Sequence, residues 1–197
     1  MTDDFKAIQT LEELWDWCKK HRESAWRFPE KWGVQGYLGR LPIGIVADEP
    51  GRRSLKHRKL GLPYPNDEDV FTRPEDEGFY GMLEKYGLKN AHVMDAHISR
   101  VTDRVQDEQV FLKQMEIIKF DALLIMDINK SRKGWGPWST VERYLKNWRG
   151  ALPRLYPIYH YSNRSRVPQS KREAAFRSTL AEVAINHPNL ASMIRVP

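Results

Sequence analysis

Residues 43–52 read IGIVADEPGR, a short apolar run that stops at two carboxylates and a Pro-Gly turn. The isoleucines and valine of this run have the apolar, β-branched character of a strand buried in a parallel sheet. Because ligands of open α/β sheets bind beyond the carboxyl ends of the strands, Asp48 and Glu49 would stand at the opening of such a site. Acidic residues also occur where a strand passes into a solvated turn, and on residue types alone that alternative is equally strong.

Length and composition predict a soluble globular protein. The chain has 197 residues, of which 41% are hydrophobic and 29% are charged, enough to bury a sizeable core. We expect one domain over residues 1–197, with an N-terminal helix at 10–21 and a core at 43–187. The chain begins without a signal-peptide pattern and has no apolar run near the roughly 20 residues of a spanning helix. These features predict a cytoplasmic protein that does not associate with membranes.

The charge distribution favours a nucleic-acid partner. The formal net charge is +6, although many proteins of this charge bind no nucleic acid. Residues 52–59, RRSLKHRK, carry six basic side chains without an intervening acid, directly after the acidic turn. Such a run is usually a solvated loop, but beside a site it can grip phosphates. The side chains expected to do so are Arg52, Arg53, Lys56 and Arg58.

Helical and strand patterns alternate along the chain. Helical patterns cover residues 11–21, 75–86, 107–120, 139–148 and 170–187. After the strand that begins at Ile43, further strands are predicted over residues 91–98, 122–128 and 155–160. Capping boxes at 10–13 and 139–142 are expected to open two of the helices. The alternation predicts an α/β domain of three layers, α/β/α, with a four-stranded, mainly parallel sheet.

Polar side chains mark the ends of three predicted strands. Asp48 and Glu49 follow the first, Asp95 lies on the second, and His160 and Ser162 end and follow the fourth. Parallel strands bring their carboxyl ends to one edge, where an acid that orients water and a histidine that donates a hydrogen bond would form a hydrolytic site. The sequence lacks the Gly-rich phosphate loops and the G-x-S-x-G elbow, which argues against P-loop, dinucleotide-binding and serine-hydrolase chemistry.

Several of these side chains have two interpretations. Asp95 is costly to bury without partners, so it lies either at the exposed end of its strand or among specific donors. Tyr64 is either a stacking platform or an ordinary lid residue. His92 and His97 would face opposite sides of a strand, so we interpret both as structural and not as joint metal ligands. The single cysteine, Cys18, excludes internal disulfides, thiolate zinc sites and iron–sulfur clusters held by several cysteines.

Four short motifs follow one another between residues 43 and 166. They are ADEPG at 47–51, GLPY at 61–64, MDAHIS at 94–99 and HYS at 160–162. In order and spacing they resemble the uracil-DNA glycosylase superfamily, whose motifs are Gly-x-Asp/Asn-Pro-Gly/Tyr, Gly-x-Pro-Phe, a polar base reader on the next strand, and His-Pro-Ser. Each motif alone is weakly specific, and their succession carries the resemblance.

The resemblance implies a uracil-DNA glycosylase-like fold, without an iron–sulfur cluster, and a matching activity. Such an enzyme hydrolyses the N-glycosidic bond of a flipped, damaged or deaminated base, with no metal or other cofactor. Glu49 and Asp48 would orient water and stabilise the sugar cation, and His160 would donate a hydrogen bond to the departing base.

The resemblance also implies binding residues and a partner. The base would contact Tyr64, Asp95 and Ser162. Single- or double-stranded DNA would be held by the basic run at 52–59, with Arg164 as the side chain that wedges into the duplex and Arg166 beside it. We expect the protein to act as a monomer.

Departures from the family pattern leave the substrate and the activity open. Asp95 stands where Asn is usual, and an ionised carboxylate only accepts hydrogen bonds. An ionised Asp95 therefore suits the exocyclic amine of cytosine or adenine better than the carbonyl of uracil. Burial that raised its pKa enough to protonate it would remove this preference. Tyr161 replaces a proline and Ala47 a glycine. One alternative is a catalytically inactive nucleic-acid-binding module of the same fold. The many acids at 66–77 motivate another, a hydrolase of free nucleosides or nucleotides.

Overall fold

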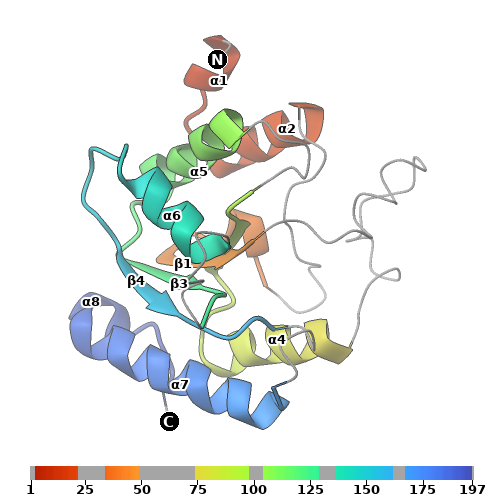
Figure 1. Ribbon diagram of the computed structural model, residues 1–197, viewed down its shortest axis with the longest axis vertical. Helices are drawn as coiled ribbons and strands as arrows, with labels where there is room; N and C mark the ends of the chain where they lie inside the picture. The colour runs from red at the N-terminus through yellow and green to blue at the C-terminus, as the bar shows by residue number, and fades with distance from the viewer. Residues whose placement is uncertain are drawn as a thin grey trace.

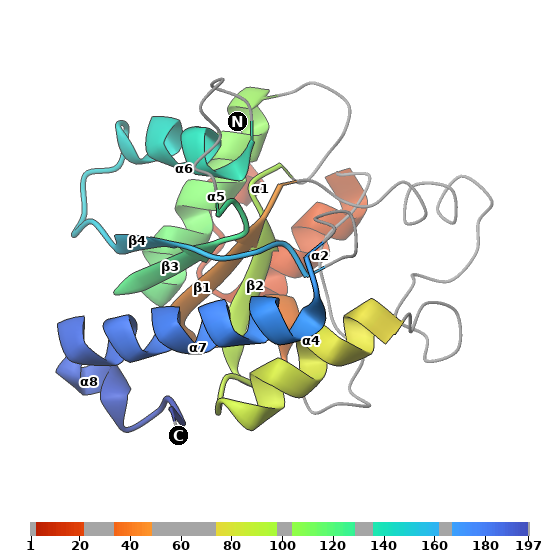
Figure 2. The ribbon, with the colours of Figure 1, turned by 60° about the horizontal axis from the view of Figure 1, so that its bottom comes forward.

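The computed structural model describes residues 3–21, 34–48, 74–97, 104–128, 136–161 and 167–196. These residues form one four-stranded sheet with helices on both faces, as Figures 1 and 2 show from two directions (Figure 1, Figure 2). The predicted three-layer α/β/α fold is therefore confirmed. None of the helices in the described ranges has the length and apolar character needed to cross a membrane.

The sheet is parallel throughout. Its strands are β1 (Leu41–Ala47), β2 (Ala91–Asp95), β3 (Ala122–Ile125) and β4 (Arg154–Pro157), in the order β2-β1-β3-β4. The last residue of β1, Ala47, is in register with the last residue of β2, Asp95. Because all strands run in one direction, their four carboxyl ends reach the same edge of the sheet.

Helices form the two outer layers (Figure 1). One layer contains α4 (Pro74–Lys85), α7 (Gln169–Asn186) and α8 (Pro188–Ala191). The other contains α5 (Arg104–Ile118) and α6 (Pro137–Leu145). Three further elements pack beside α5, namely α1 (Asp3–Lys6), α2 (Leu11–His21) and the 3-10 helix η2 (Gly36–Leu38). The helices predicted over 11–21, 75–86, 107–120 and 170–187 are confirmed, with small shifts of their ends.

Alternate residues of the strands enter the two halves of the core. In β1, Ile43, Ile45 and Ala47 pack with side chains of α4 and α7, whereas Val46 packs with side chains of α5 and α6. This alternation is the period-two geometry of a strand covered on both faces.

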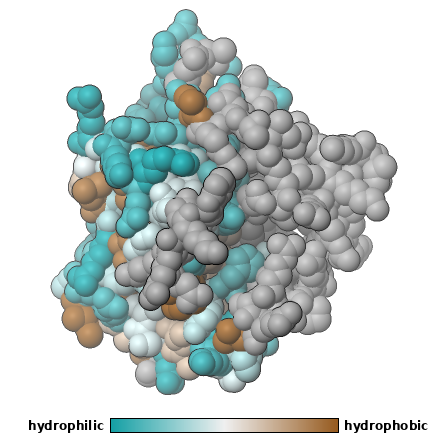
Figure 3. All heavy atoms as spheres, in the orientation of Figure 1, coloured by the Kyte–Doolittle hydropathy of each residue, from teal (hydrophilic) through white to brown (hydrophobic). Residues whose placement is uncertain are grey.

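On the face drawn in Figure 3, the described residues are mostly hydrophilic, with a few hydrophobic ones between them (Figure 3).

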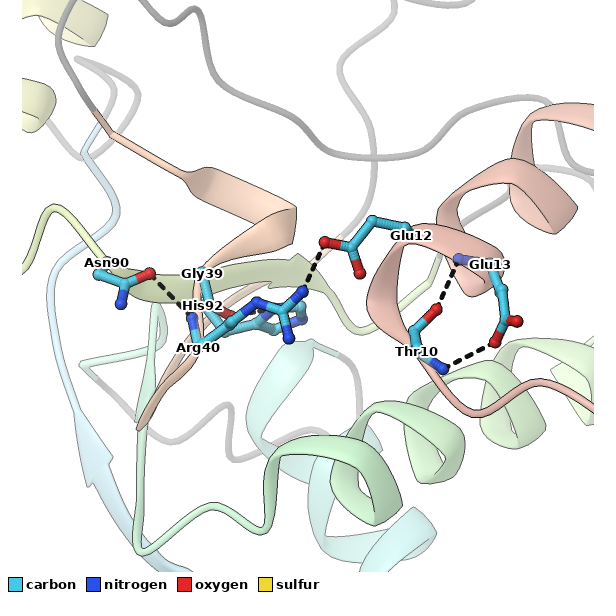
Figure 4. A network of polar contacts seen from close by, with 7 residues as sticks. All are labelled: Thr10, Glu12, Glu13, Gly39, Arg40, Asn90 and His92. Atoms are coloured by element: carbon cyan, nitrogen blue, oxygen red, sulfur yellow. Dashed lines mark hydrogen bonds and ion pairs between the residues drawn. The ribbon is translucent and has the colours of Figure 1, made fainter.

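The first capping box is confirmed and the second is wrong. Thr10 Oγ1 accepts a hydrogen bond from the Glu13 N–H at 3.2 Å, and Glu13 Oε2 accepts from the Thr10 N–H at 2.9 Å (Figure 4). Helix α6, in contrast, begins at Pro137 with Gly136 as its N-cap, so the predicted box at 139–142 lies inside the helix. Proline suits a first helical position because its missing N–H would have no partner there.

The later strands are shorter than predicted. β2 ends at Asp95, β3 at Ile125 and β4 at Pro157. His160 therefore does not end β4 but lies three residues beyond it, and His97 lies beyond the end of β2. Alternation no longer dictates side-chain direction past a strand end, which matters for both histidines.

His92 is buried between β2 and α5. Its Nε2 lies 2.8 Å from Gln114 Oε1 and its Nδ1 lies 3.2 Å from the Gly39 carbonyl oxygen. Both acceptors favour a protonated ring, but complete burial outweighs them and lowers the pKa of His92 from 6.5 to about 4. The ring is therefore neutral in the folded protein at neutral pH, in agreement with a structural role.

We expect His92 to make folding sensitive to mild acid. Between pH 6.5 and 4 the unfolded chain binds a proton at this ring and the folded chain does not. The contribution of the neutral ring to the free energy of unfolding is therefore complete above pH 6.5 and is lost as the pH falls toward 4. The free energy of unfolding should fall by about 2 kcal/mol between pH 8 and pH 5 from this group. Urea unfolding of wild type and His92→Gln at both pH values measures it. An equal pH dependence in the two proteins would contradict the assignment.

Candidate active site at the carboxyl edge

The connections of the sheet reverse their direction between β1 and β3. From β1 the chain passes through α4 to β2, which lies on one side of β1 in the sheet. From β3 it passes through α6 to β4, which lies on the other side of the sheet. The strand order thus reverses between β1 and β3. In open α/β sheets such a reversal leaves a crevice outside the carboxyl ends of the two strands, where ligands bind.

Asp48 and Asp95 lie at this edge, as predicted. The pairing of β1 and β2 continues past both strands, since the Ala96 N–H donates to the Ala47 carbonyl at 2.8 Å and the His97 N–H donates to the Asp48 carbonyl at 2.9 Å. Asp95 is 1% exposed, and Asp48 is partly exposed. Of the two interpretations of Asp95, the exposed strand end is excluded, because the residue ends its strand and is buried there.

The position of Asp95 within β2 defines the face that it shares. Ala91 and Val93, at alternate positions of the same strand, belong to the core half formed with α4 and α7. Asp95 therefore points to the α4 and α7 side of the sheet. A carboxylate that is buried at a strand end needs polar partners to stay ionised, and its protonation state decides whether it accepts or donates toward a ligand.

Asp127 is a third carboxylate at this edge, and the sequence interpretation missed it. The Met126 N–H donates to the Val46 carbonyl at 2.8 Å, which extends the pairing of β1 and β3 beyond Ile125 and brings Asp127 beside the end of β1. The residue was overlooked because the third strand was predicted to continue to 128. Its signal was the one used for Asp48, an apolar run that stops at an acid.

His160 lies in the segment after β4, beyond the carboxyl end of that strand. Its ring stacks on the ring of Tyr161, with centroids 4.8 Å apart and an angle of 19° between the planes. Tyr161 in turn stacks on Phe79 of α4 at 5.0 Å and 25°. The Arg172 side chain of α7 donates a hydrogen bond to the Tyr161 carbonyl. The histidine is thus tied to both helices on the side of the sheet that Asp95 faces.

A small hollow lies beside this stack, between α4, α7 and the segment after β4. Phe79 and Phe176 contribute aromatic surface from the two helices, and Ile158 and Tyr161 contribute apolar surface from the segment. Arg172, 8% exposed, supplies the positive charge of its wall. The lining is mainly apolar, and the volume of about 20 Å³ is close to the space that one water molecule needs.

A buried polar cluster lies on the opposite side of the same edge. His97, 7% exposed, has its Nδ1 3.2 Å from the Tyr144 hydroxyl and 3.5 Å from Asp107 Oδ2, and its Nε2 3.3 Å from Thr140 Oγ1. The prediction that His92 and His97 face opposite sides is wrong, because both contact the α5 and α6 layer. His97 lies past the end of β2, where the alternation no longer holds.

The other nine predicted site residues lie outside the described residues. These are Glu49, Arg52, Arg53, Lys56, Arg58, Tyr64, Ser162, Arg164 and Arg166. Of the predicted catalytic and base-binding residues, Asp48, Asp95 and His160 are described, and all three lie at the carboxyl edge. Within the described ranges, no three His, Cys, Asp or Glu side chains form a group that could hold a metal ion.

A scan against models of known protein families and a search of curated proteins each find no match to this chain.

Proposed function

We propose that this protein is a DNA glycosylase of the uracil-DNA glycosylase type, which hydrolyses the N-glycosidic bond of a flipped base. One observation carries the proposal: carboxylates at the ends of β1 and β2 and an imidazole after β4 share the carboxyl edge of one parallel sheet. The order of the four motifs in the sequence, which resembles that family, supports it independently.

The spacing of the strands suits this chemistry. Neighbouring strands lie about 4.8 Å apart, so β1 and β4, separated by β3, lie about 10 Å apart. In the proposed reaction a flat base lies across the carboxyl ends of these strands, with an acid on one side and an imidazole on the other. The base leaves as an anion that His160 stabilises by a hydrogen bond, and the sugar cation is stabilised by Glu49 and Asp48, which also orient the attacking water.

The buried carboxylate of Asp95 bears on the choice of base. In its ionised form it accepts a hydrogen bond from an exocyclic amine, and in its protonated form it can also donate to a carbonyl such as that of uracil. The base is read by Asp95 together with Tyr64 and Ser162. The net charge of +6 and the basic residues 52–59, Arg164 and Arg166 supply contacts to DNA phosphates, and we propose a cytoplasmic monomer.

A panel of DNA substrates tests the proposal. Single strands and duplexes carrying uracil, hypoxanthine, xanthine or a mismatched normal base are incubated with the protein, and abasic sites are detected as strand breaks after alkali. We expect wild type to release at least one base, and Glu49→Gln to release it about 100-fold more slowly. Glu182→Gln is the matched control, because Glu182 pairs with Arg154 at the opposite, amino end of β4 and should not affect release.

The same panel, extended by the free nucleosides of the same bases, separates the alternatives. Salt-sensitive binding of the oligonucleotides without any abasic product would instead indicate a binding module that lacks catalysis. Release of base from free nucleosides but from no oligonucleotide would indicate a small-molecule hydrolase. Either result would contradict the proposed DNA glycosylase activity.

A further inference from the structure

Three aromatic rings form a continuous stack that ends at His160. The rings of His160, Tyr161 and Phe79 follow one another at 4.8 and 5.0 Å with interplanar angles of 19° and 25°. We call these three residues the ring stack. Phe79 is 2% exposed and belongs to the core under α4, so the far end of the stack cannot move without disturbing that core.

The backbone of the ring stack is held separately from its side chains. Arg172, on α7 and 8% exposed, donates from Nη1 to the carbonyl oxygen of Tyr161. A hydrogen bond from a charged and largely buried donor is among the stronger ones in a protein. Residues from α4 and α7 therefore fix the side chain and the carbonyl of the residue that follows His160.

We propose that Tyr161, Phe79 and Arg172 are positioning residues that hold the His160 imidazole in the orientation needed for base release. The inference rests on the proposed function. In the resembled family, a proline follows the motif histidine and restricts the backbone directly. Tyr161 cannot restrict the backbone in that way, and here the ring stack and the Arg172 hydrogen bond perform the same task from outside.

The stacked ring, and not the phenolic hydroxyl, carries this role. Tyr161→Phe should therefore keep the rate of base release. Tyr161→Leu should lower kcat about 10-fold to 100-fold, because a small displacement of a catalytic group slows the chemical step. It should leave KM nearly unchanged, because Tyr161 itself does not hold the substrate. Arg172→Met should lower kcat in the same direction. Arg177→Met is its matched control, since Arg177 is exposed on the same helix.

The test combines kinetics with a probe of the ring itself. Single-turnover and steady-state base release are measured for wild type and the four variants, and the imidazole Hε1 resonance of His160, assigned with His160→Gln, is recorded by NMR. Stacking on Tyr161 shifts this resonance upfield. We expect the shift to persist in Tyr161→Phe and to disappear in Tyr161→Leu, with similar melting temperatures for both.

The outcomes separate this inference from the proposed function. If Tyr161→Leu loses the shift but releases base at the wild-type rate, or if Tyr161→Phe is as slow as Tyr161→Leu, the positioning role is wrong and the glycosylase activity stands. If wild type releases no base from any substrate while the shift is present, the proposed function is wrong and the positioning role is overturned with it.

Discussion

Replacing His160 by alanine is expected to slow base release about 100-fold or more, which corresponds to about 3 kcal/mol of barrier. In the proposed mechanism the imidazole donates a hydrogen bond to the negative charge on the departing base, and alanine would leave that charge without its donor. The effect should fall on kcat, because the charge develops only as the bond breaks. His160→Gln, which keeps an N–H donor, should lose less activity than His160→Ala.

Single-turnover release from the preferred substrate is the measurement for His160→Ala. His187→Ala is a matched control, because it removes another partly buried imidazole, which contacts the Tyr156 hydroxyl at 3.1 Å and lies outside the carboxyl edge. We expect it to retain the wild-type rate at a temperature where both variants are folded. A loss in His187→Ala equal to that in His160→Ala would show that the effect is one of stability and not of chemistry.

Gly39→Ala is expected to destabilise the fold by on the order of 3 kcal/mol. Gly39 precedes β1 and passes the start of β2 so closely that a Cβ would lie 2.1 Å from the Ala91 carbonyl oxygen and 2.9 Å from that of Asn90. Both atoms are backbone, so no side-chain rotation relieves the overlap. The Gly39 carbonyl also contacts His92, and the neighbouring Arg40 N–H donates to Asn90 Oδ1 at 3.1 Å (Figure 4).

Urea unfolding of Gly39→Ala beside Gly81→Ala measures this contribution. Gly81 lies within α4, and a Cβ there would meet nothing within 4 Å. Alanine at that position should stabilise the protein by about 0.5–1 kcal/mol, because it favours the helix more than glycine does. If the two substitutions changed the free energy of unfolding equally, the close approach of Gly39 to β2 would not be present in solution.

Patterns that are local in the sequence were predicted well. The capping box at Thr10 and Glu13 identified the start of α2, and the apolar periodicity identified α4, α5 and α7. The ends of β2, β3 and β4 were predicted too late, because buried apolar residues such as Ala96, Met126 and Ile158 follow the last residue of each strand. Because of that error, the direction of the His97 side chain was predicted from strand alternation that no longer applies there. For the same reason Asp127 was not recognised as a carboxylate at the end of a strand.

The sequence by itself determined the order of helices and strands, and with it that Asp48, Asp95 and His160 reach one edge. Those features depend on periodicity and on turns, which neighbouring residues specify. Only the tertiary structure decided that His97 meets Thr140 and Tyr144, and that Tyr161 lies between His160 and Phe79. Such contacts join residues far apart in the chain, and they arise from the strand order and from helix packing, which no local pattern encodes.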